Sequence, residues 1–199
     1  MENTITNPIN PSGISTPGST RKMHPQKFMM WFAIGSLSLT FAGFTSAYLV
    51  RQGQGMWEKF QIPTIFYIST VVILLSSFTY FFGAKAFKSG NMKNYNLFMW
   101  ITFFLGASFM GLQFLGFQEL YQQNIRLNGN VSNSFFFVIA GMHLLHIFAA
   151  LIALLFVTIR NNNIKSDNRK YLGIEILGYF WHFIDILWLY LFVFLMLYR

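Results

Sequence analysis

The chain has 199 residues, of which 54% are hydrophobic, 20% are aromatic and only 10% are charged. This composition, with a mean hydropathy of +0.46, excludes an ordinary soluble globular protein and indicates a membrane protein. The absence of cysteine excludes disulfides, thiolate metal sites, cysteine-based haem attachment and cysteine catalysis. The formal net charge of +8 does not indicate nucleic-acid binding, because the basic residues lie in loops between apolar segments and not in one patch.

The apolar segments define the expected architecture. Residues 1–27 are polar and rich in Ser, Thr, Asn, Pro and Gly, which predicts a flexible tail and not a cleavable signal peptide. Five apolar segments follow, each long enough to cross a hydrocarbon core of about 30 Å: residues 28–50, 64–84, 97–117, 135–158 and 174–197. Because lipid offers the backbone no hydrogen bonds, each is expected to be a continuous helix. The sequence therefore predicts an all-α polytopic membrane protein in which residues 28–199 form one five-helix transmembrane domain.

The basic residues predict how this domain is oriented. The tail and the second and fourth loops lie on one side of the membrane and hold ten of the fourteen Lys and Arg residues. The positive-inside rule then places the N-terminus in the cytoplasm and the C-terminus on the periplasmic side of the cell's inner (plasma) membrane.

The fourth segment contains two histidines, His143 and His146, which are three residues apart and therefore share one helix face. The glycine and alanines around them permit close approach of a neighbouring helix. Three interpretations remain open at this stage: hydrogen bonding between helices, ligation of a metal or haem, and proton transfer.

The last segment contains Glu175, His182 and Asp185 inside an otherwise apolar run. An ionised aspartate at mid-depth costs roughly 2.5–3.5 kcal/mol on insertion scales, so it needs a compensating partner. Glu175 and His182 lie on one stripe, and a His182–Asp185 pair at i, i+3 can share a proton or a charge-assisted hydrogen bond. Trp181 and Trp188 repeat the seven-residue spacing on an adjacent stripe and are interpreted as packing residues. The five polar residues predict a buried polar seam between the fourth and fifth helices, with no catalytic, cofactor-binding or metal-binding residue.

Two longer motifs in these segments resemble a known family. GMHLLHIF is similar to the G-x-H-x-x-H helix of subunit III of haem–copper oxidases, and GIEILGYFWHFIDILWL is similar to the last helix of that subunit. The resemblance extends more loosely over residues 28–199 and suggests a short five-helix form, since the long family form has seven helices. Leu37 stands where many members carry a buried glutamate, so a proton role through that carboxylate is not expected here.

The resemblance implies an accessory subunit that carries no cofactor of its own. It would adjoin catalytic subunit I and other oxidase subunits, within the oxidase or a larger respiratory supercomplex. Haems and copper would lie in those partners, which reduce O2 to water and translocate protons with cytochrome c or quinol as electron donor. The subunit would stabilise the catalytic subunit, support proton uptake and bind phospholipid. Arg160 aligns with a basic position at the end of the fourth helix and is the candidate lipid-binding residue.

Three other functions remain alternatives. The first is the related small subunit of a nitric oxide reductase. The second is a haem-binding membrane cytochrome b that uses His143, His146 or His182 as axial ligands. The third is a transporter with Asp185 as its proton carrier.

Overall fold

The computed structural model describes residues 25–55, 62–123, 125, 131–161 and 168–198. Within these ranges the chain forms five helices: α1 (Pro25–Gln52), α2 (Thr64–Lys88), α3 (Met92–Gln122), α4 (Val131–Asn161) and α5 (Asn168–Tyr198). All five are long and apolar enough to cross a membrane, which confirms the predicted all-α class and the five spans. Residues 1–24, most of the predicted tail, lie outside the described residues.

The helices α1, α3, α4 and α5 begin and end beyond the apolar segments that the sequence delimits, and α2 ends beyond its segment. The extra turns carry polar side chains, which are stable in a helix at the headgroup level but give no hydropathy signal. Between α2 and α3 the chain reverses within a few residues. Gly90 adopts a φ of +76° there, and the side chain of Asn91 accepts a hydrogen bond of 3.2 Å from the backbone N–H of Asn94.

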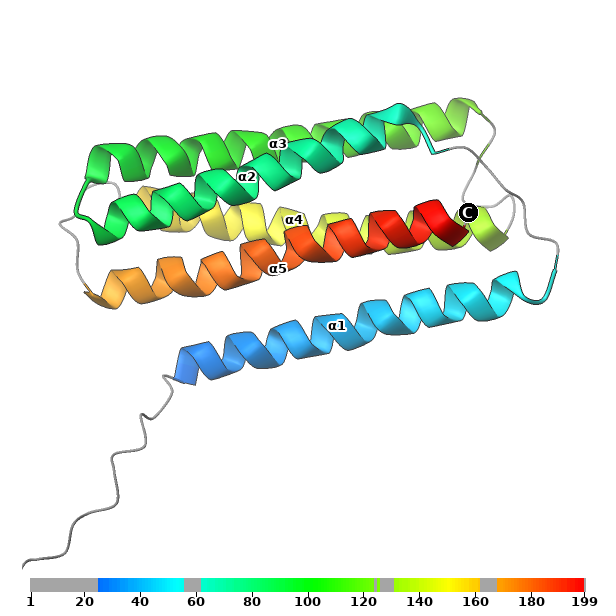
Figure 1. Cartoon of the computed structure of the whole chain (residues 1–199), viewed down its shortest axis with the longest axis horizontal. Coiled ribbons are helices and arrows are strands. Elements are labelled where there is room, and N and C mark those ends of the chain that lie inside the picture. The colour runs from blue at the N-terminus through cyan, green and yellow to red at the C-terminus, as the bar shows by residue number, and fades with distance from the viewer. Residues whose placement is uncertain (1–24, 56–61, 124, 126–130, 162–167, 199) are drawn as a thin grey trace, which may run out of the picture.

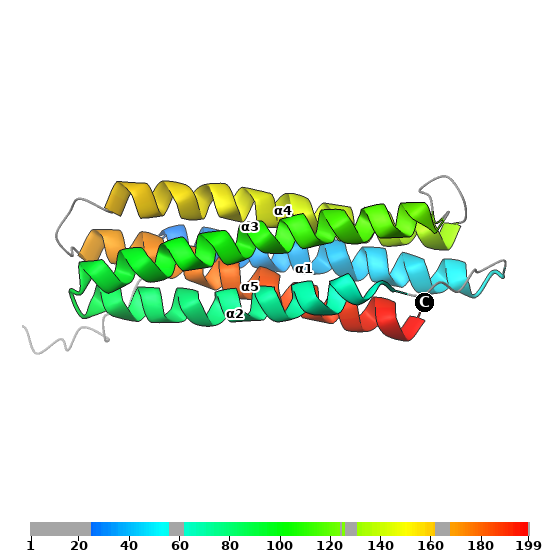
Figure 2. The ribbon, with the colours of Figure 1, turned by 90° about the horizontal axis from the view of Figure 1, so that it is seen from above.

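Four of the helices form a closed ring, in which α2 packs on α3, α3 on α4, α4 on α5 and α5 on α2. The fifth helix, α1, lies outside this ring against α4 and α5 (Figure 1). The view from above shows that the long axes of the helices run in nearly the same direction (Figure 2). In the most apolar stretch of α1 only 11% of residues are buried, against 50% in that of α5. α5 is therefore the central helix of the bundle and α1 the peripheral one.

Small residues let the ring close tightly around bulky aromatic side chains. A Cβ added to Gly106 of α3 would lie 2.9 Å from both Leu151 of α4 and the Trp181 ring of α5. A Cβ added to Gly116 would lie 2.7 Å from the ring of Phe66 on α2. These glycines allow fully buried rings to sit directly against a neighbouring backbone, which is how membrane helices gain contact without a hydrophobic driving force.

Basic side chains gather at one end of the bundle. At that end α1, α3 and α5 begin and α2 and α4 end (Figure 1). The helices carry Lys27, Lys85, Lys88, Lys93, Arg160, Arg169 and Lys170 at that end, whereas Arg51 lies at the opposite end. The charge asymmetry that the sequence predicts is thus present between the two ends of the folded bundle.

Candidate functional site

Both tryptophans and His182 of α5 are directed toward α2. Four hydrogen bonds join these two helices at successive levels, and we call this set the α2–α5 ladder. They are Tyr80 Oη to Ile174 O (2.7 Å), Ser77 Oγ with His182 Nδ1 (2.6 Å), Trp181 Nε1 to Ser76 Oγ (3.2 Å) and Trp188 Nε1 to Thr70 Oγ1 (3.0 Å). The ladder gives both indole N–H groups an acceptor in a region where lipid offers none.

The two hydroxyls that accept from the tryptophans also donate a hydrogen bond of their own. Thr70 donates to Phe66 O at 2.8 Å and Ser76 donates to Ile73 O at 2.7 Å, so each can still accept from an indole. A hydroxyl that bonds its own helix leaves no unpaired donor in the bilayer if the helices separate. Such a hydroxyl can therefore accept a hydrogen bond from a tryptophan of the next helix at little cost in free energy.

A second set of polar contacts links α2 to α3. The hydroxyls of Thr79 and Thr102 lie 2.8 Å apart, and Gln113 Nε2 donates to Ser69 Oγ at 2.8 Å. Ser69, Thr102 and Gln113 are fully buried. α2 thus carries hydroxyl groups toward two neighbours and connects α3 and α5 through polar contacts.

On α4, His143 lies in an aromatic enclosure. Its ring stacks on Trp188 of α5 at 5.1 Å between centroids, and Phe41 of α1 presents an edge at 6.2 Å. Phe109 of α3 packs edge-on against the same Trp188 at 5.3 Å. His143 is fully buried, and neither ring nitrogen has a hydrogen-bond partner among the described residues. The imidazole of His143 therefore packs like an aromatic ring in the core, where four helices meet.

The second histidine of α4 faces the same neighbour, as the shared helix face predicts. His146 is partly exposed, its Nδ1 lies 2.7 Å from Met142 O of the preceding turn, and its ring meets the edge of Phe41 at 5.8 Å. Both histidines thus pack against α1, and within the described part of the chain no hydrogen bond joins either of them to α5.

Glu175 lies at the basic end of α5, apart from the other acidic and imidazole groups of that helix. Its Oε1 accepts a hydrogen bond of 2.8 Å from Lys27 Nζ of α1 and one of 3.0 Å from the Tyr179 hydroxyl. The sequence pairs Glu175 with the polar residues of α4 and α5. In the structure Glu175 instead pairs with α1, because Lys27 lies in the first turn of that helix, which begins at Pro25.

His182 and Asp185 do not form the expected direct pair among the described contacts. The imidazole of His182 turns toward Ser77 of α2 and is partly exposed, whereas Asp185 is 1% exposed and points into the bundle. Three residues along a helix leave about 60° between two side chains, which is enough to send them to different neighbours. Neither carboxylate oxygen of Asp185 has a hydrogen-bond partner among the described residues.

The five residues of the expected seam therefore serve different contacts. His143 and His146 face α1 and the aromatic core, Glu175 pairs with α1, and His182 with α2. The remaining candidate, Arg160, is exposed in the last turn of α4 at the basic end. No group of three or more His, Asp or Glu side chains within the described ranges is placed to hold a metal ion. Neither the haem-binding nor the transporter alternative gains support from this arrangement.

The α2 hydroxyls are the residues that sequence reasoning missed. Thr70 and Ser77 of the ladder are seven residues apart, and the two tryptophans of α5 repeat the same spacing. Equal spacing on two apolar segments is the signal that could have identified the ladder, because side chains repeated every seven residues return to nearly the same helix face.

Comparisons with known proteins agree with the motifs. A family model described as cytochrome c oxidase subunit III matches residues 29–199. A probable cytochrome c oxidase subunit 3 from Nocardia farcinica is 27% identical over 91% of this chain and 96% of its own. The corresponding protein of Thermostichus vulcanus is 31% identical over 80% of this chain and 81% of its own, and that of Bacillus sp. (strain PS3) 28% over 83% of each. A match over the whole transmembrane domain, together with the five spans and the two motifs, shows that the chain belongs to the cytochrome c oxidase subunit III family.

Proposed function

We propose that this chain is the cofactor-free accessory subunit of a respiratory haem–copper oxidase, which reduces O2 to water in the aerobic electron transport chain. Its task is to brace the catalytic subunit and to hold phospholipid beside it, so that the complex keeps its proton uptake and its activity over many turnovers. The haems and copper of the reaction belong to the partner subunits.

The observation that carries this proposal is the α2–α5 ladder. The polar side chains of an intramembrane helix usually mark a substrate or proton path. In α5 both tryptophans and His182 instead make direct hydrogen bonds to hydroxyls of α2. These contacts fix the orientation of α5 relative to α2. A rigid accessory subunit needs helices that are held in fixed positions.

The contacts of α4 support the same role. His143 packs against Trp188 and Phe41, and both of its ring nitrogens are buried in the core. The imidazole contributes ring area to the core where α1, α3, α4 and α5 meet. It therefore links the peripheral α1 to the rest of the bundle.

We further propose that the basic end of the bundle faces the cytoplasm, which leaves the C-terminus on the periplasmic side of the inner membrane. The positive-inside rule supports this orientation, because the end with more basic residues is the one expected on the cytoplasmic side. Arg160 lies exposed there, and its planar guanidinium suits a lipid phosphate.

Affinity purification from native membranes tests the proposal. A tagged chain should bring with it a large membrane subunit and the Soret and α-band absorption of haem. The same chain expressed without those partners should be colourless and contain neither iron nor copper at stoichiometric levels.

Two results would contradict the proposal. One is a purified isolated chain that shows a Soret band, since the haem would then be its own. The other is a tagged chain that leaves the native membrane without any haem-containing polypeptide, under detergent conditions that preserve a known oxidase in the same preparation.

A further inference from the structure

The outward side of α5 lies between two helices that do not meet. Within the described helices, α1 packs on α4 and α5, and α2 packs on α3 and α5, so the face of α5 between α1 and α2 stays uncovered. We call this strip the open face of α5, and it consists of His182, Ile186, Leu189, Val193 and Leu197. These residues follow one another at three- and four-residue steps and therefore form one continuous stripe.

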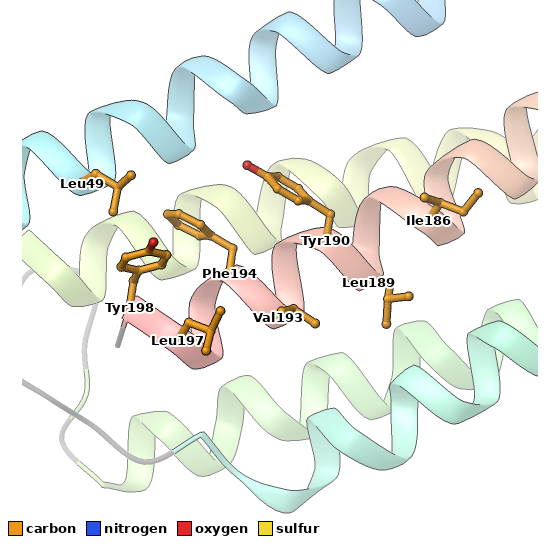
Figure 3. A pocket seen from close by; sticks show the side chains of 8 residues that line it. All are labelled: Leu49, Ile186, Leu189, Tyr190, Val193, Phe194, Leu197 and Tyr198. Carbon is orange, nitrogen blue, oxygen red and sulfur yellow. The ribbon is translucent and has the colours of Figure 1, made fainter.

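A groove occupies the end of this face nearest the C-terminus. It has a volume of about 600 Å³, with Leu49 of α1 on one side and α5 as its floor (Figure 3). Its α5 side chains include Ile186, which is 66% exposed, and Leu197, which is 67% exposed, whereas Phe194 is only 7% exposed and points toward α1 (Figure 3).

The open face also carries hydrogen-bonding capacity at the middle of the membrane. His182 lies near the midpoint of α5, one turn before Ile186, and its ring is partly exposed. Ser77 engages its Nδ1, so Nε2 is the nitrogen that remains for a neighbour. Acyl chains cannot hydrogen-bond, so lipid would leave Nε2 of His182 unsatisfied.

A second groove on the opposite side of the bundle provides a contrast. It has a volume of about 320 Å³, lies between α3 and α4, and is lined only by apolar side chains: Phe103, Ala107, Met110, Phe148, Leu151, Ile152 and Leu155. Acyl chains satisfy such a surface completely. The polar centre of the open face therefore distinguishes it from a surface built for lipid alone.

We propose that the open face of α5 is the surface on which a transmembrane helix of a neighbouring subunit docks, with its side chains in the groove and a hydrogen-bonding group opposite His182 Nε2. This inference rests on the proposed function, which supplies a membrane-embedded partner, and adds the face by which that partner is held. A helix with a polar side chain or an exposed backbone carbonyl at mid-depth is the chemistry that the face recognises.

Site-directed photocrosslinking tests the proposal, because the chain contains no cysteine of its own. Ile186→Cys places a single thiol on the open face, and Ile152→Cys places one in the apolar groove on the other side. The two isoleucines are matched in size and in exposure, at 66% and 54%, so neither substitution should disturb folding. Each variant is expressed in the native host, labelled with benzophenone maleimide in its membranes, irradiated and analysed by denaturing electrophoresis.

The proposal predicts a crosslinked polypeptide from Ile186→Cys and no comparable product from Ile152→Cys. A product at Ile152 alone would place the partner on another face and overturn the proposal. Lipid adducts alone at Ile186, with the labelled chain still co-purifying with haem, would overturn it while leaving the proposed function intact. A chain that co-purifies with no haem protein at all would instead refute the proposed function. Leu197→Cys, which is 67% exposed on the same face, repeats the test at a second position.

Discussion

The hydrogen bond between Trp188 and Thr70 can be removed with little change of shape by Thr70→Val. Thr70 donates to Phe66 O at 2.8 Å and accepts from Trp188 Nε1 at 3.0 Å. Valine keeps the branched side chain but offers the indole no acceptor. The exposed Thr40 of α1 provides a matched control, because it also donates to the carbonyl four residues earlier, at 2.9 Å, but serves no tryptophan.

The expected magnitude follows from the burial of both partners. Trp188 is 1% exposed and Thr70 is 7% exposed, so water cannot replace the lost acceptor. An unsatisfied buried donor costs about 1–3 kcal/mol, whereas pairwise coupling energies between polar groups of membrane helices average roughly 0.6 and reach about 1.7 kcal/mol. We therefore expect Thr70→Val to lower the free energy of unfolding by about 1–2 kcal/mol and Thr40→Val to leave it nearly unchanged.

Equilibrium unfolding of the purified chain in mixed detergent micelles, followed by tryptophan fluorescence and circular dichroism, measures this difference. A double-mutant cycle with Trp188→Phe isolates the pairwise term from the other contacts of the indole. The reasoning is wrong if Thr70→Val and Thr40→Val have the same effect, or if the cycle gives no coupling between Thr70 and Trp188.

Three further changes address other contacts of the bundle. Gly178→Ala should lower the unfolding midpoint, because the added Cβ would lie 2.8 Å from the Tyr80 ring and displace its hydroxyl from α5, whereas Gly43→Ala, with no atom within 4 Å, should not. Glu175→Gln should weaken the attachment of α1 only slightly and only at low salt, since the ion pair is part-exposed; hydrogen exchange at the start of α1 would show this, and a large effect at high salt would contradict it. Arg160→Ala should reduce the phospholipid retained in native mass spectrometry, and an unchanged lipid count would remove Arg160 as a lipid ligand.

Hydropathy was sufficient to predict the spans, because the cost of exposing backbone polar groups to lipid leaves a long apolar segment few alternatives to a helix. The helix ends were less accessible to sequence reasoning. α3 begins at Met92 and α5 at Asn168, each about one turn or more before its apolar segment. At the headgroup level a helix needs no apolar residues, so its first turns are not visible in hydropathy.

The polar contacts were predicted only in part. The sequence identified Trp181 and Trp188 as packing residues, and their rings do pack in the core. From the sequence we expected His182 and Asp185 to pair with each other and with α4. Residue spacing alone can reveal a contact within one helix, such as an i, i+3 pair, but not a contact with another helix. Which helix lies beside α5 is a tertiary property, and the hydroxyls of α2, which bond their own backbone, give no local sign of a second role.

The most direct test of the claim that the buried ionisable groups of α5 serve structure is the activity of an oxidase that carries Asp185→Asn. This change removes the ionisable group from a position that is 1% exposed while keeping its size. A group that transfers a proton in turnover contributes about 10²–10⁴ to the rate. We predict that the assembled variant begins O2 reduction at close to the normal rate and loses activity sooner during sustained turnover. An assembled variant that is inactive from its first turnovers would contradict the account.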